Sequence, residues 1–221
     1  MSRPTLDPIE TRVAGALAEK SLATPDHYPL TTNALVAACN QKSSRDPVTS
    51  YSERDVAGAV DRLMRRGLAG TTAGAGHRVA KIRHLLDRAL DLSRRELATL
   101  AVLLLRGPQT PGEIKSRTSR LADIASVEDV DEALWMLSDR DQPLVVRLDR
   151  EPGQSADRFA HLLSGDAEAA APREPEREGP SEPPVSAADP ARQSLAERVR
   201  ELEGTVARMQ QEWAEFRAEF E

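Results

Sequence analysis

Apolar residues recur at three- and four-residue intervals in several stretches of the chain, and each stretch follows a residue that can cap a helix. A side-chain oxygen at that position accepts hydrogen bonds from backbone N–H groups that have no partner within the helix. Asp7, Ser52 and Ser126 stand at such positions, while 93–96 and 110–113 match the Ser/Thr-x-x-Glu capping box. The pattern therefore predicts a helix start at each of these sites.

One part of this pattern occurs twice. The helices predicted after Ser52 and after Ser126 have the same capping residue and the same apolar spacing, and a short helix is predicted before each, over 32–39 and 111–118. The matching residues lie 74 positions apart: Ser52, Val56, Val60 and Leu63 correspond to Ser126, Val130, Leu134 and Leu137.

Each copy is followed by two short stretches typical of β-strands around a glycine-bearing turn, 68–72 with 78–83 and 144–148 with 158–162. Helix, helix, helix, hairpin is the order of elements in a winged helix. The sequence thus predicts a mainly α protein with small β-hairpins (α+β). We expect two tandem winged-helix domains, at 1–84 and 85–164, each with its own core.

Beyond residue 164 the composition changes. Pro, Glu, Ala and Ser dominate 165–189, which predicts a disordered linker because such a segment buries too little apolar surface to order itself. Apolar residues in 190–221 follow a heptad spacing, which is typical of a coiled coil, although this helix could instead fold back onto its own chain. We expect a homodimer through Leu195, Val199, Leu202, Val206, Met209, Trp213, Phe216 and Phe220.

The formal charge of −6 is unevenly distributed along the 221 residues. Lys and Arg exceed Asp and Glu by four in residues 1–90, whereas acidic residues are in excess by three in 91–165 and by seven in 166–221. Because charges in solution act over a Debye length of about 8 Å, only the first region attracts a polyanion.

Cysteine content and hydropathy indicate the cellular compartment in which the protein is expected. Cys39 is the only cysteine, so no internal disulfide can form, and its place on an apolar helix face predicts a buried, unreactive thiol. The longest apolar run, 97–105, is too short to cross a bilayer, and the N-terminal residues lack the apolar region of a signal peptide. We expect a cytoplasmic protein with no membrane partner.

Two segments closely resemble the signature of the bacterial YceH-like family. They read TPDHYPL followed by NALVAACNQKSSRDPV over 24–48, and LLLRGPQTPGE over 103–113. The resemblance extends from about residue 5 to about residue 165, and it implies a tandem winged-helix fold, in agreement with the order of elements. It implies no biochemical activity and no cofactor.

The polar segment before the third predicted helix is longer than the usual turn of a helix-turn-helix. We expect Asn40 to end the preceding helix in a left-handed conformation and 46–47 to form a turn. Two interpretations are open, a loop held by its own hydrogen bonds and a partner-binding loop that uses Lys42 and Arg45. The residues of this loop that match the family signature are Asn40, Gln41, Lys42, Ser43, Arg45, Asp46 and Pro47.

The third helix of the first domain, over 52–66, is a candidate recognition helix for DNA. Arginine side chains there could reach phosphates or guanine edges, and the wing would add cations that contact the backbone. Asp55 and Asp61 oppose this hypothesis, and a merely solvated helix face is the alternative. The candidate nucleic-acid contacts are Arg54, Arg62, Arg65, Arg78 and Lys81.

The equivalent helix of the second domain is acidic, with four carboxylates in 128–132 that would repel DNA. We therefore expect the second domain to act as a scaffold or to contact a protein. Trp135 and Met136 stand at helical spacing in this helix, and we expect them to lie in the core because large apolar residues are usually buried.

The sequence contains no motif of a known type of active site. The four histidines lack metal-ligand spacing, the glycines form no nucleotide-binding fingerprint, and no paired carboxylates accompany a nucleophile. We expect no enzyme, no cofactor and no metal. Two functional hypotheses remain: a DNA-binding regulator that dimerises through its C-terminal helix, and a protein-interaction adaptor that uses winged helices as docking modules.

Overall fold

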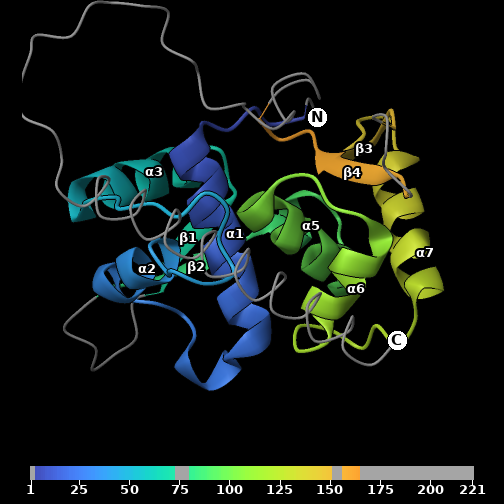
Figure 1. Cartoon of the computed structure of the whole chain (residues 1–221). Helices are drawn as coiled ribbons and strands as arrows, with labels where there is room; N and C mark the ends of the chain where they lie inside the picture. The colour runs from blue at the N-terminus through green and yellow to red at the C-terminus, as the bar shows by residue number, and fades with distance from the viewer. Residues whose placement is uncertain (1–2, 73–79, 151–155, 165–221) are drawn as a thin grey trace, which may run out of the picture. The chain divides into compact units, whose positions relative to one another are not determined.

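The computed structural model describes residues 3–72, 80–150 and 156–164 (Figure 1). The chain divides into two units, 1–174 and 175–221, and all of the described residues belong to the first. The predicted linker, the heptad residues and Arg78 lie outside the described residues.

The described residues form a helix-rich α+β fold, as predicted, with two small antiparallel hairpins (Figure 1). In the first half the elements are α1 (Pro8–Ala23), a short 3-10 helix (Pro25–His27), α2 (Thr32–Cys39), α3 (Glu53–Arg65), β1 (Ala69–Thr72) and β2 (Lys81–His84). In the second half they are α4 (Leu86–Ala89), α5 (Arg94–Arg106), α6 (Pro111–Thr118), α7 (Val127–Ser138), β3 (Val145–Leu148) and β4 (Arg158–His161).

The predicted helix starts are confirmed. Asp7 caps α1, Ser52 caps α3, Ser93 caps α5, Thr110 caps α6 and Ser126 caps α7, and in each case an acid three residues later closes a capping box. These reciprocal hydrogen bonds satisfy backbone donors that the helix itself leaves unpaired. The sequence therefore fixes each start locally, before any tertiary packing is considered.

Each hairpin receives an additional short pairing that the sequence did not predict. Leu30, just before α2, forms a two-way backbone bridge with Ile82 of β2, with N···O distances of 3.0 and 2.7 Å. Gln109, just before α6, pairs in the same way with Phe159 of β4. The segments that lead into α2 and into α6 are thus each hydrogen-bonded to the hairpin of their own half.

The 74-residue repeat is present in the structure and extends to an ion pair. The inward faces of α3 and α7 bury matching residues, Val56, Val60 and Leu63 in one and Val130, Leu134 and Leu137 in the other. Arg66 and Arg140, also 74 positions apart, each reach back to a capping-box glutamate, Glu10 of α1 and Glu96 of α5 respectively. A buried carboxylate thus connects α1 to the end of α3 in the first half and α5 to the segment after α7 in the second.

The two halves share one hydrophobic core, where we expected two. Helices α1 and α5 pack directly against each other, and the buried residues of both halves form a single continuous cluster (Figure 1). Gly15 permits this close approach, because a Cβ atom there would lie only 3.0 Å from the Leu104 Cβ and the Leu105 Cγ atoms. The strongly apolar 97–105 run is consistent with this position, since almost every face of α5 is covered.

Candidate functional site

The polar loop between α2 and α3 is held by its own hydrogen bonds. The Asn40 side chain donates from Nδ2 to the Tyr51 carbonyl at 2.8 Å and accepts from the Tyr51 N–H at 2.8 Å, which joins the two ends of the loop. The expected left-handed conformation at Asn40 was wrong, because its φ is −94°. The left-handed residue is Ser44, with φ 61°. Asn40 therefore stabilises the loop through its side chain and not through its backbone conformation.

Arg45 is buried at the base of this loop, where its side chain is held by contacts within the protein. Its guanidinium donates to both carboxylate oxygens of Glu19, at 3.1 and 2.6 Å, and its Nε donates to the Ala38 carbonyl at 3.0 Å. Its side chain has no solvent exposure. A second buried arginine, Arg12 of α1, donates to the carbonyls of Cys39 and Pro47. These two buried arginines therefore provide hydrogen-bond donors to backbone carbonyls in and just before the loop.

The remaining predictions for this loop concern Cys39 and Lys42. Cys39 is fully buried, as predicted, and burial raises the pKa of its thiol to about 12, so the reactive thiolate is not formed near neutral pH. Lys42 is exposed, with Gln41 half-buried beside it. Of the two residues expected to serve a partner-binding loop, only Lys42 therefore remains accessible.

The candidate DNA contacts fall into separate groups. Arg62 is occupied, since its guanidinium donates to Asp7 at 2.8 Å and to Glu10 at 3.1 Å, and its charge is compensated by these carboxylates of α1. Arg54 and Arg65 are exposed on α3, and Lys81 is half-exposed on β2. Because Arg54 and Arg65 are eleven residues apart, about three helical turns, they share one face with Asp61 between them.

Helix α7 carries an exposed apolar face that the sequence analysis missed. Trp135 is 61% exposed and Met136 is 45% exposed, so the expectation that they lie in the core was wrong. Val127, at 38% exposure, lies at the start of α7, about 80° around the helix from Trp135 and on the opposite edge from Met136. The buried side of α7 is already filled by Val130, Ala133, Leu134 and Leu137, which leaves no core position for the large residues. We call Val127, Trp135 and Met136 with the intervening acids Asp131 and Glu132 the α7 face.

The repeat could have revealed this exposure. Trp135 and Met136 correspond to Asp61 and Arg62 of α3 when the 74-residue offset is applied, and both of those are polar. Asp61 is indeed exposed. A large apolar residue at a position that is polar in the other copy indicates an outward-facing side chain.

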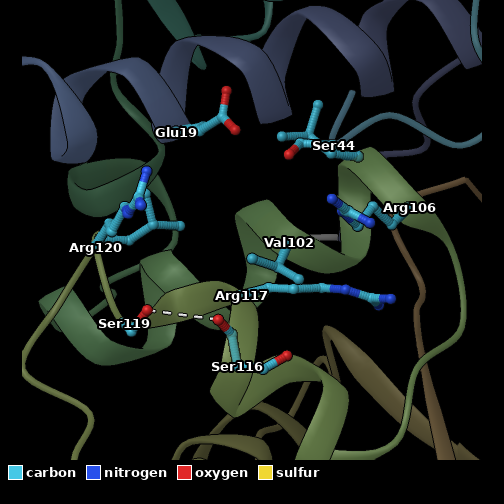
Figure 2. A pocket seen from close by; sticks show the side chains of 10 residues that line it. Glu19, Ser44, Val102, Arg106, Ser116, Arg117, Ser119 and Arg120 are labelled. Atoms are coloured by element: carbon cyan, nitrogen blue, oxygen red, sulfur yellow. Dashed lines mark hydrogen bonds between the residues drawn. The ribbon is translucent and has the colours of Figure 1, made fainter. Parts of the chain in front are cut away.

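A cleft of about 370 Å³ lies between the α2–α3 loop and the ends of α5 and α6. Figure 2 shows Arg106 and Arg117 on one side, Arg120 on the other, and Glu19 and Ser44 across from α5. Ser116 and Ser119 add hydroxyl groups to the wall. We call this group of Arg106, Arg117, Arg120 and the three serines the arginine cleft.

Metal ligands are not gathered in the part of the chain that the structure describes: no group of three or more His, Cys, Asp or Glu residues is arranged to hold an ion. His161 is buried, and burial lowers its pKa to about 4, while His84 lies against the Ser21 hydroxyl at 2.8 Å. Among the described helices, none is both long and apolar enough to span a membrane.

The repeated order of helices and hairpins defines a helix-rich α+β protein. Its surface carries the apolar and acidic α7 face and the arginine cleft. Comparison with known proteins assigns the family. Residues 6–154 match the family described as "Protein of unknown function, DUF480", and the chain belongs to this family.

Several bacterial relatives carry the name UPF0502 protein. The chain is 44% identical to one from Aeromonas hydrophila over 209 residues, which cover 93% of each protein, and 49% identical to one from Geobacter sulfurreducens over 166 residues, which cover 75% of each. A relative from Pectobacterium carotovorum is 42% identical over 214 residues, covering 95% of this chain and 96% of its own length. The matches to the Aeromonas and Pectobacterium relatives cover 93% and 95% of the chain, so they extend beyond residue 165. The expected membership in an uncharacterised bacterial family is confirmed.

Proposed function

We propose that the chain is a non-catalytic adaptor, built from two winged helices, that docks a protein partner on the α7 face. The winged-helix assignment is supported by the order of helices and hairpin in each half and by the backbone bridges that Leu30 and Gln109 make to the hairpins. The exposed pair of Trp135 and Met136 is the observation that carries the docking role.

Large apolar side chains on one helix face favour a protein contact over simple solvation. Single exposed apolar residues are common, but here two large ones, Trp135 and Met136, are neighbours on the exposed side of α7. Tryptophan and methionine are enriched at protein interfaces, and tryptophan is frequent among the residues that dominate binding energy. The α7 face therefore combines residues typical of interface anchors with acids that lie between them.

The acids on α7 indicate the chemistry of the partner. Glu128, Asp131 and Glu132 are exposed beside the apolar residues. Some loss of hydration and the neighbouring Glu128 raise the pKa of Asp131 above its usual value, so a nearby cation would stabilise its charged form. We therefore expect a docking segment that presents apolar side chains together with Lys or Arg, such as a basic amphipathic helix.

The docking role can be tested by photo-crosslinking in cells, using the full chain with a photoreactive amino acid in place of Glu132. We expect an adduct with a protein that contains a basic, apolar segment. Trp135→Ser with Met136→Ser should reduce its yield by about tenfold or more, because burying such anchors typically contributes at least about 2 kcal/mol. Val48→Ser is the matched control, since Val48 is 57% exposed but lies in the α2–α3 loop.

The identity of the adduct decides the outcome. A protein adduct that persists in the Trp135 and Met136 variant would contradict the proposal, as would an adduct consisting only of a second copy of this chain. Loss of the adduct in the Val48→Ser control would also contradict it, since that substitution leaves the α7 face intact.

DNA binding by the first half is the second candidate function, and the exposure of Arg54 and Arg65 on one face of α3 favours it. Lys81 of β2 would add a backbone contact from the hairpin. Asp61 lies between the two arginines and weakens the case. Photo-crosslinking of the purified full chain to duplex DNA, with a photoreactive residue in place of the exposed Asp61, tests this candidate: a yield of DNA adduct that falls as salt is raised before irradiation would support it, and no adduct at low salt would refute it.

We further propose that residues 190–221 form a coiled coil that makes the protein a homodimer. The heptad spacing from Leu195 to Phe220 supports this, because an unpartnered helix would leave Trp213 and Phe216 in water. Analytical ultracentrifugation of the full chain should show a dimer at about 50 μM, and Leu202→Asp with Met209→Asp should convert it to a monomer by placing charges between the helices. A monomeric wild-type protein would disprove the dimer, whereas a dimer that survives the double substitution would place the interface elsewhere.

A further inference from the structure

We infer that the arginine cleft is a binding site for a small phosphorylated molecule, with the phosphate held between Arg106 and Arg120. Nothing in the docking proposal depends on this cleft, because α7 contributes no residue to its lining.

Two of the arginines are free to bind a ligand. The guanidinium groups of Arg106 and Arg120 make no hydrogen bond and no ion pair with any other residue that the structure describes, and Arg120 is exposed. Arg106 is half-buried at the end of α5, where water can solvate its charge only in part. Exposed arginines without partners are common, but a half-buried one that faces a cleft is left with donors that only a ligand or water can satisfy.

The charges around Arg106 leave a positive excess. Glu19 lies in the wall but is already bound by Arg45, and Glu113 is paired with Arg117 at 3.4 Å. Loss of hydration and the positive charges of Arg117 and Arg45 lower the pKa of Arg106, and they outweigh the opposing effects of Glu19 and Asp46. An anion in the cleft would relieve this repulsion.

The positions of the donors match a phosphate better than a carboxylate. A carboxylate has two oxygens and is well matched by a single guanidinium fork, whereas a phosphate presents three terminal oxygens that can accept from several directions. Arg106 and Arg120 approach from opposite sides of the cleft, and Ser44 approaches from the loop (Figure 2). The Ser44 hydroxyl has no hydrogen-bond partner among the described residues and is available to donate.

The size and floor of the cleft indicate a small molecule. Its volume of about 370 Å³ lies in the range of small-ligand pockets, about 300 to 1,000 Å³. Val102, Leu105 and Leu121 supply apolar surface next to the arginines. This combination suits a phosphate monoester with a compact organic group, and a nucleoside monophosphate is a practical probe.

The site can be tested by calorimetric and NMR titration of the full chain at constant ionic strength with inorganic phosphate, adenosine monophosphate and adenosine. We expect saturable binding of the two phosphates, shifts of the Ser44 and Ser119 amide signals, and no response to adenosine. Arg106→Gln and Arg120→Gln should each weaken binding of adenosine monophosphate by about tenfold to one-hundredfold, since a hydrogen bond to a charged group contributes about 1.5–3 kcal/mol.

Arg54→Gln and Arg65→Gln are the matched controls, because they remove the same charge from an exposed helix face outside the cleft. They should change the affinity less than about twofold. The inference is overturned if neither phosphate saturates the protein, or if the control variants weaken binding as much as the cleft variants, which would indicate general attraction to positive charge. Circular dichroism of each variant establishes that its fold is retained.

Discussion

Replacing Arg45 with alanine is expected to lower the free energy of unfolding by about 3 kcal/mol, the lower end of the usual cost of breaking a buried ion pair, because Lys20 at 3.7 Å would be the remaining cation beside the largely buried Glu19 carboxylate. Glu19 accepts two parallel hydrogen bonds from Arg45, and its side chain is only 15% exposed. The same substitution removes the donor that satisfies the Ala38 carbonyl at the end of α2. Equilibrium denaturation with urea of the full chain and its variant measures the loss.

Two further variants distinguish the loss of the Arg45–Glu19 ion pair from the effect of changing any residue of the loop. Lys42→Ala removes a charge three positions away in the same loop, but Lys42 is exposed, so stability should change by no more than about 0.5 kcal/mol. Arg45→Lys keeps the charge and loses the bidentate geometry, and its cost should fall between the other two. If Arg45→Ala costs less than about 1 kcal/mol, Glu19 must be solvated in the native state, and the buried pair described above would be wrong.

The structural role of Arg45 also shows where prediction from sequence reached its limit. The polar composition of the loop allowed either self-contained hydrogen bonding or a partner contact. The pairing that decides between them joins residues 26 positions apart, on α1 and on the loop. No local pattern encodes such a contact, because it depends on how α1 packs beside α2.

Local features were predicted well because their physics is local. Capping boxes, the proline that starts α6 and the strand-like runs each act over a few residues, and the structure reproduces them within one to three positions. The repeat was also correct, since apolar spacing fixes which side of α3 and α7 is buried. The same spacing also determines which residues face solvent, and this consequence was missed. Because Leu134 and Leu137 face the core, Trp135 has to face outward.

The arginine cleft could not have been found from the sequence. Ser44 belongs to a loop of the first half, far in sequence from Arg106 and Arg117 on the consecutive helices α5 and α6, and only the packing of the two halves brings the loop and these arginines together. The expectation of two separate cores hid this possibility, because separate domains would leave no defined wall between the loop and α6. The shared core of α1 and α5 is therefore what creates the cleft.

Gly15 is the position on which this shared core depends most. Replacing it with valine is expected to lower the free energy of unfolding by about 3 kcal/mol, at the upper end of what overpacking usually costs, since the side chain would have to fit where a Cβ atom alone is already crowded by α5. Even one added carbon would approach the Leu104 Cβ and the Leu105 Cγ atoms to 3.0 Å, and both leucines are buried. Chemical denaturation measures this change directly, and the amide signals of α5 should shift as the helices separate.

Gly58 provides a matched control because it also lies inside a helix, and a Cβ atom there would meet only the flexible end of Arg62 at 3.4 Å. Gly-to-Ala changes at both sites bring the same gain in helix propensity, about 0.8–1.0 kcal/mol, so their difference isolates the packing term. We expect Gly58→Ala to stabilise the protein and Gly15→Ala to destabilise it. If Gly15→Ala is as stabilising as Gly58→Ala, α5 has room for the added carbon. In that case the two halves would not be locked together at this contact, and the cleft between them would lack a fixed shape.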